Sequence, residues 1–306
     1  MNKTATVLTG RNNIFTVEMD GRRYLCRIKG KSLALEERSH NPLAPGDLVT
    51  VAEIDETHAT GVIVERSPRR NAFQRYNRKR AALQTLAANV DLVVVVMSAD
   101  HPAFRNRFVD RVLVLAEHHE IAALVAVTKA DLDGERAIAE TDRYRGLGYE
   151  AIALRRDVPE TLETLRAALE DKRSVFVGQS GVGKSTILNR LVGSELQETG
   201  EVSSRYLRGR HTTNAAVLVS HDRIQIVDTP GVRELDCRHV PPEELDHAFR
   251  DFRPFLGRCA HNDCSHTEDS GCAVLRAVAD GALDATRHES YLRLFTEIES
   301  LLEEYP

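Results

Sequence analysis

The sequence has no apolar run that approaches the roughly 20 residues a helix needs to cross a bilayer. Its N-terminus also lacks the basic and then apolar layout of a signal peptide. The first absence excludes a membrane-spanning helix, and the second argues against export. We therefore predict a cytoplasmic protein that has no membrane partner.

Cysteine is scarce, with five in 306 residues, and three of them cluster around a histidine. An odd, clustered set in a cytosolic chain favours a metal site over disulfides. The pattern Cys259-x4-Cys264-x-His266-x5-Cys272 supplies three thiolates and one imidazole, enough for a closed tetrahedral zinc site. We predict one structural Zn2+ there, which folds a segment too short to bury its own core. Free cysteines are the alternative.

The net charge is only -5, but it is unevenly distributed. Residues 1–80 hold 15 Lys and Arg against 9 Asp and Glu, whereas the rest holds 26 against 37. The basic end is therefore the candidate nucleic-acid face. Five short strands between turn pairs predict an OB-type, RNA-binding barrel over residues 1–68, with a purely structural barrel as the alternative. The strands are expected at Thr4–Leu8, Ile14–Met19, Arg22–Ile28, Asp47–Ile54 and Thr60–Glu65.

A basic segment, SPRRNAFQRYNRKR, follows the barrel at residues 67–80. It shows no apolar periodicity, so we predict a basic linker or extended arm, placed at residues 69–84. Phe73 and Tyr76 stand among its arginines, and such rings can stack on unpaired bases while the charges follow phosphates. Alternatively, the two rings dock on a neighbouring domain.

Beyond this segment, fully apolar strands alternate with helical stretches. Such a pattern predicts an α/β domain over residues 85–240 whose mostly parallel sheet is covered on both faces. It is the architecture on which phosphate-binding loops are built. The strands are expected at Leu92–Met97, Ala122–Val127, Ala151–Leu154, Val175–Val177, Val217–Val219 and Ile224–Val227.

The sequence GQSGVGKST matches the P-loop pattern G-x-x-x-x-G-K-[ST] between an apolar strand and a helical run. Its glycines let the backbone curl so that successive N–H groups point at phosphate oxygens. We expect Lys184 to reach the β and γ phosphates and Ser185 to ligate Mg2+. The expected nucleotide-binding residues of the loop are Gly178, Gln179, Ser180, Gly181, Val182, Gly183, Lys184, Ser185 and Thr186.

The sequence DTPG comes after a further apolar strand. Asp228 ends that strand, so we expect its carboxylate in the magnesium shell, while the N–H of Gly231 approaches the γ phosphate. Between the two phosphate motifs lies the polar loop GRHTTN at residues 209–214. A switch loop contributes a threonine to magnesium at this place, and Thr213 is the first choice and Thr212 the second.

A base-reading motif, TKAD, stands before the phosphate loop instead of after it. Asp131 can accept two hydrogen bonds from guanine that adenine cannot offer, and Lys129 can lay its stem along the ring. The order predicts a circularly permuted GTPase; an ATPase would require Asp131 to be coincidental. GTPases usually have Asn in place of Thr128, so we expect weaker bracing and lower affinity, with a base-backing loop near Ala151–Leu154. The motif comprises Thr128, Lys129, Ala130 and Asp131.

Many GTPases orient the attacking water with a Gln just after the DTPG turn, where this chain has Val232. A valine cannot hold water through its side chain, so slow intrinsic hydrolysis is expected. His211 is the best replacement, with Arg233 and Glu234 behind it, although a merely solvated histidine is the alternative.

Taken together, TKAD, GQSGVGKST, GRHTTN, DTPGVRE and CX4CXHX5C, in this order, resemble the RsgA family of circularly permuted ribosome-biogenesis GTPases over nearly the whole chain. The resemblance implies a zinc-binding helical domain over residues 241–306, with the zinc ligands as given above and His211 as the switch histidine. It further implies action late in maturation of the small ribosomal subunit, rRNA binding, and hydrolysis stimulated by the subunit and coupled to release. We expect a monomer. An RNA-binding clamp that hydrolyses GTP only incidentally is the alternative.

Overall fold

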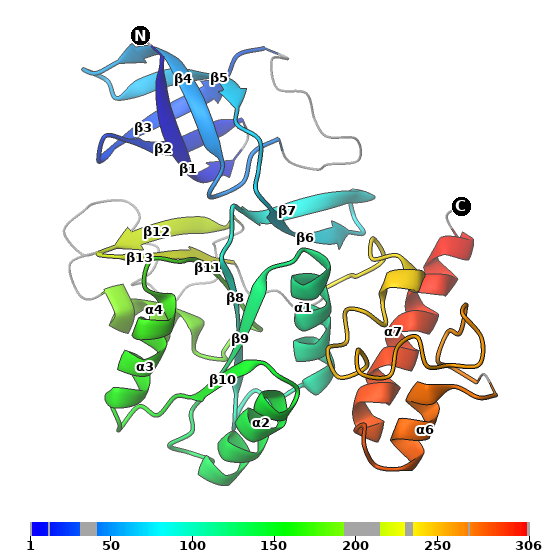
Figure 1. Cartoon of the computed structure of the whole chain (residues 1–306). Helices are drawn as coiled ribbons and strands as arrows, with labels where there is room; N and C mark the ends of the chain where they lie inside the picture. Colours follow the sequence, from blue (N-terminus) through cyan, green and yellow to red (C-terminus); the bar gives the residue numbers. More distant parts are fainter. Residues whose placement is uncertain are drawn as a thin grey trace.

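The computed structural model describes residues 2–11, 13–30, 42–192, 215–229, 235–268 and 270–304. Along the sequence the chain forms a barrel, a hairpin, an α/β domain and a helical part (Figure 1). Within these residues no helix is both long enough and apolar enough to span a bilayer.

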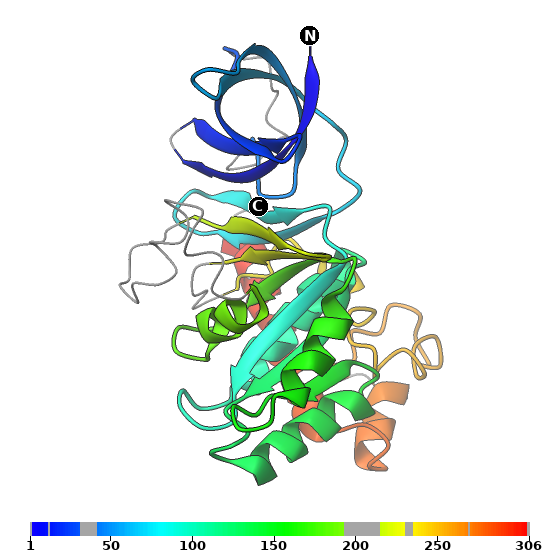
Figure 2. The same ribbon diagram turned by 90° about the vertical axis from the view of Figure 1, so that its left-hand side faces the viewer.

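Strands β1 to β5 form a closed barrel in the order β1-β2-β3-β5-β4 (Figure 2). Alternate side chains along each strand, such as Val17 and Met19, point inward and fill the interior. β3 and β5 close the barrel by parallel pairing. The predicted OB-type barrel is confirmed, with β1 (Lys3–Arg11), β2 (Ile14–Met19), β3 (Arg22–Ile28), β4 (Leu48–Asp55) and β5 (Thr60–Arg66).

The α/β domain has a six-stranded sheet in the order β10-β9-β8-β11-β13-β12, parallel except for the edge strand β12. Val93 and Val95 on one face pack with α1 and α2, while Val94 and Val96 on the other pack with α3 and α4. The predicted doubly covered sheet is confirmed. Its strands are β8 (Leu92–Ser98), β9 (Ala122–Thr128), β10 (Glu150–Ala153), β11 (Arg173–Val177), β12 (Val217–His221) and β13 (Ile224–Asp228), and its helices are α1 (Asn106–His118), α2 (Gly134–Gly146), α3 (Glu160–Leu169) and α4 (Lys184–Val192).

The segment predicted as a basic linker over residues 69–84 is instead a β-hairpin of β6 (Ala72–Asn77) and β7 (Ala82–Ala88). The prediction was wrong because the hairpin is fixed by contacts with residues far along the chain, among them the hydrogen bond of 3.2 Å from the Tyr76 N–H to the carbonyl oxygen of Asp236. Phe73 is fully buried and meets His119 at the end of α1 edge-on, with 6.4 Å between ring centroids. The guanidinium of Arg238 lies over the ring of Tyr76, with its Cζ 4.3 Å from the ring centroid. Both rings are docked, so the base-stacking interpretation is not supported.

The barrel is fixed to the α/β domain by one turn and one strand. The Gly46 φ is +93°, and a Cβ there would lie 2.2 Å from the carbonyl oxygen of Ala88, so only glycine fits. Next to it, the buried Asp47 carboxylate binds the Arg69 guanidinium through Nε at 2.7 Å and Nη2 at 2.9 Å. Thr9 of β1 donates to the carbonyl of Ala216, just before β12, at 2.9 Å. The barrel therefore sits against the edge strand of the sheet.

The helical part contains η2 (Pro242–Glu244), α6 (Ala273–Ala279) and α7 (Ala285–Glu304). Arg287 of α7 is 1% exposed and makes ion pairs with Asp110 of α1 at 2.5 Å and with Asp251 at 2.9 Å. Its guanidinium also lies 4.5 Å from the ring centroid of Phe249. This buried ion triad joins the helical part to the α/β domain.

Candidate nucleotide and metal sites

The phosphate loop leaves the buried strand β11 and ends where α4 begins, at Lys184. Geometry requires glycine at Gly178, Gly181 and Gly183, as the first and last of these illustrate. A Cβ on Gly178 would lie 2.4 Å from the carbonyl oxygen of Val96, and Gly183 has a φ of +97°. The loop is thus pressed against β8 and turned so that the following helix presents its N-terminus, as phosphate binding requires.

Lys184 is 7% exposed, and its ammonium donates to the carbonyl oxygens of Gly178 and Gln179. Burial lowers the pKa of Lys184, and the nearby Asp228 carboxylate acts against this shift. The two hydrogen bonds hold the Lys184 ammonium at the loop that would bind the phosphates.

Asp228 lies at the end of β13, beside β11. Its Oδ1 is buried and has no hydrogen-bond partner within the described residues. Burial raises the pKa of Asp228 to about 6, and Lys184 acts to lower it. A buried carboxylate oxygen without a partner, next to a phosphate loop, fits Mg2+, which prefers oxygen ligands. Ser185, the neighbouring hydroxyl, is exposed on the first turn of α4.

The base motif at the end of β9 is bound to the phosphate loop. Thr128 is 5% exposed, and its Oγ1 lies 2.6 Å from the carbonyl oxygen of Val182 and 3.1 Å from that of Met97. Thr128 therefore contacts the phosphate loop directly through its hydroxyl, in the place where other GTPases have an amide, and the lower affinity stays a prediction. Lys129 has a φ of +57° and donates to the carbonyl of His101.

Asp131 is oriented by a residue that the sequence did not single out. Its Oδ1 accepts a hydrogen bond of 3.1 Å from the backbone N–H of Arg156. The segment expected to back the base, Ala151–Leu154, is mostly strand β10, so the loop begins later than expected. The residues after β10 lie beside the base motif, since the Ala130 N–H donates a hydrogen bond of 3.2 Å to the carbonyl oxygen of Leu154.

Six of the predicted candidate residues lie outside the described residues: His211, Thr212, Thr213, Gly231, Arg233 and Glu234. Their roles stay predictions. On one side of Gly231 the chain is held by Thr229, whose hydroxyl donates to the carbonyl of Phe176 at 2.7 Å.

The predicted zinc ligands converge, with their four donor atoms within 4.8 Å of one another. His266 Nδ1 lies 3.6, 3.5 and 3.4 Å from the Sγ atoms of Cys259, Cys264 and Cys272, respectively. Tetrahedral Zn2+, with Zn–S about 2.3 Å and Zn–N about 2.0 Å, requires separations of roughly 3.6 Å. Burial acts to raise the pKa of Cys272, but the N–H of Leu275 and His266 bring it below the usual value, which favours the thiolate. The residues therefore fit zinc.

Asp246 completes this site from outside the ligand set. Its Oδ2 lies 3.2 Å from Nε2 of His266, so the proton is held on Nε2 and the Nδ1 lone pair faces the three sulfur atoms. Carboxylates that orient a metal-bound imidazole in this way raise its basicity.

We expect Asp246→Ala to weaken zinc binding about 10- to 100-fold, because the imidazole loses its orienting acceptor. The measurement is zinc transfer to a chromophoric chelator from the purified protein. Glu243→Ala, an exposed carboxylate on η2, is the matched control and should transfer zinc like the unchanged protein. Equal transfer by both variants would contradict the role.

A phosphate loop after β11, a base motif on β9 earlier in the chain, and three sheet strands that precede β11 in sequence define a circularly permuted P-loop GTPase. The description "RsgA GTPase" belongs to the family model that matches residues 66–238. The small ribosomal subunit biogenesis GTPase RsgA of Borreliella afzelii is 34% identical over 297 residues, covering 96% of both chains. That of Chlorobaculum parvum is 38% identical over 289 residues, covering 92% of this chain and 93% of the relative.

Solved structures agree. The crystal structure of YjeQ from Thermotoga maritima matches with a TM-score of 0.74 at 30% identity, covering 97% of this chain and 99% of that one. YloQ, described as a circularly permuted GTPase, matches with a TM-score of 0.71 at 27% identity, covering 98% and 96%. The chain belongs to the RsgA GTPase family, and it is a GTP hydrolase.

Proposed function

We propose that this GTPase binds the small ribosomal subunit through its rRNA, acts late in maturation of the subunit, and uses subunit-stimulated GTP hydrolysis for its own release. The observation that carries the proposal is the likeness to small ribosomal subunit biogenesis GTPases over 96% of the chain, which includes the barrel and the zinc-binding part. We further propose that the protein acts in the cytoplasm and as a monomer.

The proposed division of labour follows the described geometry. Lys184 contacts the β and γ phosphates, Asp131 reads guanine, and Asp228 holds Mg2+ together with Ser185 and Thr213. The carboxyl group of Asp228 has to be deprotonated to bind the ion, so metal binding releases a proton at pH values below about 6. Zinc is structural, because all four of its ligands come from the protein.

The attacking water is proposed to be oriented by His211, since Val232 offers no hydrogen-bonding side chain. Hydrolysis would then be slow until the subunit positions the histidine. The same valine favours a second candidate function. In this alternative the protein is an RNA-binding clamp that uses bound GTP to hold the RNA and hydrolyses it only incidentally.

The test is the steady-state rate of GTP hydrolysis with and without purified small ribosomal subunits. We expect stimulation of about 100-fold, the size of a positioned general base, and none from purified large subunits. Tight guanine-nucleotide binding without stimulation by small subunits would contradict the proposal and support the clamp.

A further inference from the structure

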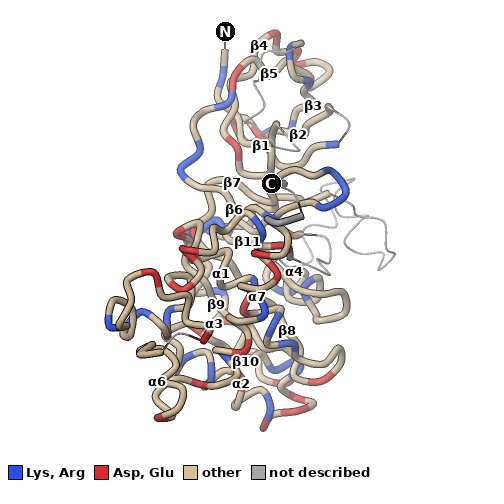
Figure 3. Tube along the Cα trace, turned by 90° about the vertical axis from the view of Figure 1, so that its right-hand side faces the viewer, with Lys and Arg blue, Asp and Glu red and all other residues tan. Residues whose placement is uncertain are grey.

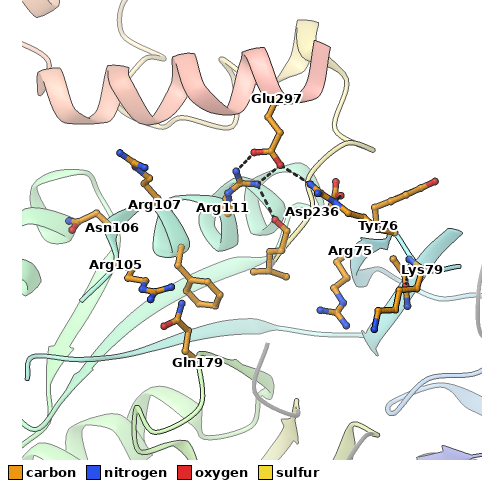
Figure 4. Close-up of a pocket in the computed structure, with 14 residues that line it drawn as sticks. Arg75, Tyr76, Lys79, Arg105, Asn106, Arg107, Arg111, Gln179, Asp236 and Glu297 are labelled. Carbon is orange, nitrogen blue, oxygen red and sulfur yellow. Dashed lines mark hydrogen bonds and ion pairs between the residues drawn. The ribbon is translucent and has the colours of Figure 1, made fainter. Parts of the chain in front are cut away.

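A cavity of about 1190 Å³ opens between the hairpin, the start of α1, α7 and the phosphate loop (Figure 4). The hairpin contributes Lys79 to its wall, α1 contributes Arg107, and Arg105 precedes that helix. The phosphate loop contributes Gln179. The cavity thus adjoins the nucleotide site without containing any of the base motif.

The lining is strongly basic. Its two carboxylates, Asp236 and Glu297, are already engaged by ion pairs with Arg78, at 2.6 and 3.2 Å. Three further cations in the wall, Lys79, Arg105 and Arg107, are exposed, and no carboxylate pairs with them within the described parts of the chain. Figure 3 shows the basic residues that follow the chain around the hairpin. A polyanionic ligand would supply the negative charge that pairs with these three cations.

Gln179 links this cavity to the reaction centre. The residue is only 9% exposed, and its side chain lines the same cavity as Arg105 (Figure 4). Its backbone carbonyl accepts a hydrogen bond of 2.9 Å from the ammonium of Lys184. A ligand that hydrogen-bonds to the amide would therefore touch the residue that holds the P-loop lysine.

The aromatic residues of the wall offer little free ring surface for stacking on bases. Arg238 lies over one face of the partly buried Tyr76 ring, and Phe108 is buried. The cavity is also larger than the roughly 300–1,000 Å³ of small-molecule sites. Charge without stacking surfaces is suited to phosphates along a strand, because guanidinium and ammonium groups bind phosphate oxygens whatever the base sequence.

We propose that this cavity binds the phosphodiester backbone of an RNA strand of the small ribosomal subunit and brings it against the phosphate loop. The inference rests on the proposed function and names the surface through which the subunit reaches the nucleotide site. The strand runs from Lys79 on the hairpin to Arg105 and Arg107 at the start of α1, beside Gln179.

The test compares Lys79→Gln/Arg105→Gln/Arg107→Gln with a control of equal charge loss, Arg136→Gln/Arg190→Gln/Arg276→Gln, on the exposed surfaces of α2, α4 and α6. Binding to small subunits, and separately to protein-free small-subunit rRNA, is measured across salt concentrations. Three lost phosphate contacts should reduce the slope of log affinity against log salt by about two for both probes. The control variant should keep a slope that is steeper than that of the cavity variant. Thermal unfolding of both variants checks that they fold.

A triple variant that keeps the wild-type slope, while the wild-type protein binds both probes, would overturn this inference and leave the proposed function intact. Loss of subunit binding with unchanged rRNA binding would also overturn it, in favour of an acidic protein segment. If the wild-type protein bound neither probe, the proposed function would fail together with the inference.

Discussion

Lys184→Ala is expected to lower the rate of GTP hydrolysis by about 10²- to 10³-fold, the typical cost of removing one preorganised charge donor from a transition state. The side chain is buried and its ammonium is held by two carbonyl groups of the loop, so the substitution removes a charge that the fold fixes at the phosphate loop. The measurement is single-turnover hydrolysis with saturating GTP and Mg2+, because saturation separates chemistry from affinity.

Lys172→Ala is the matched control. Lys172 lies immediately before β11 and Lys184 follows the loop at the other end of that strand, and the Lys172 ammonium also donates to a carbonyl, that of Ala168, at 2.9 Å. It should hydrolyse GTP at the unchanged rate. If Lys184→Ala does so as well, the ammonium does not act on the phosphates.

Arg287→Ala is expected to lower the free energy of unfolding by about 3–5 kcal/mol, because it leaves Asp110 and Asp251 in a buried site without their cation. The measurement is denaturant unfolding of the zinc-loaded protein. Arg293→Ala is the control on the same helix. Its exposed i,i+4 pair with Glu289 should be worth only about 0.3–0.5 kcal/mol.

The pH dependence of this loss provides a second check. Burial already raises the pKa of Asp110, and Arg287 acts to lower it. Without the arginine the folded-state pKa of Asp110 rises further above its unfolded value, so the folded variant binds a proton that the unfolded chain does not. Its stability deficit should therefore shrink as the pH falls through the folded-state pKa. A deficit that is constant between pH 7 and pH 5 would show that the charge is not the cause.

The parts of the fold that sequence predicted well are those where one segment determines the outcome. The P-loop lies between a buried strand and a helix, and the apolar runs of β8 and β9 form strands with a neighbour on both sides in the sheet. The zinc ligands are close in sequence, so the loop that carries them has to bring them together.

The parts that sequence missed depend on partners far along the chain. Nothing near β6 reveals that Phe73 packs against His119, and nothing in TKAD reveals that Thr128 contacts the carbonyl of Val182. The Arg287–Asp110 pair spans 177 positions. A charged or polar residue in the sequence gives little indication of such a long-range contact, because the same side chain is usually exposed to water.

The packing of the barrel against the edge strand β12 has a consequence for the solubility of the protein. β12 is the last strand of its sheet, and its outer backbone groups would be free to pair with the edge of another molecule. In the intact chain β1 approaches this strand, and Thr9 already occupies the carbonyl of Ala216. The barrel therefore also covers this edge of the α/β domain, and an evolutionary or engineered loss of the barrel would expose an aggregation-prone edge.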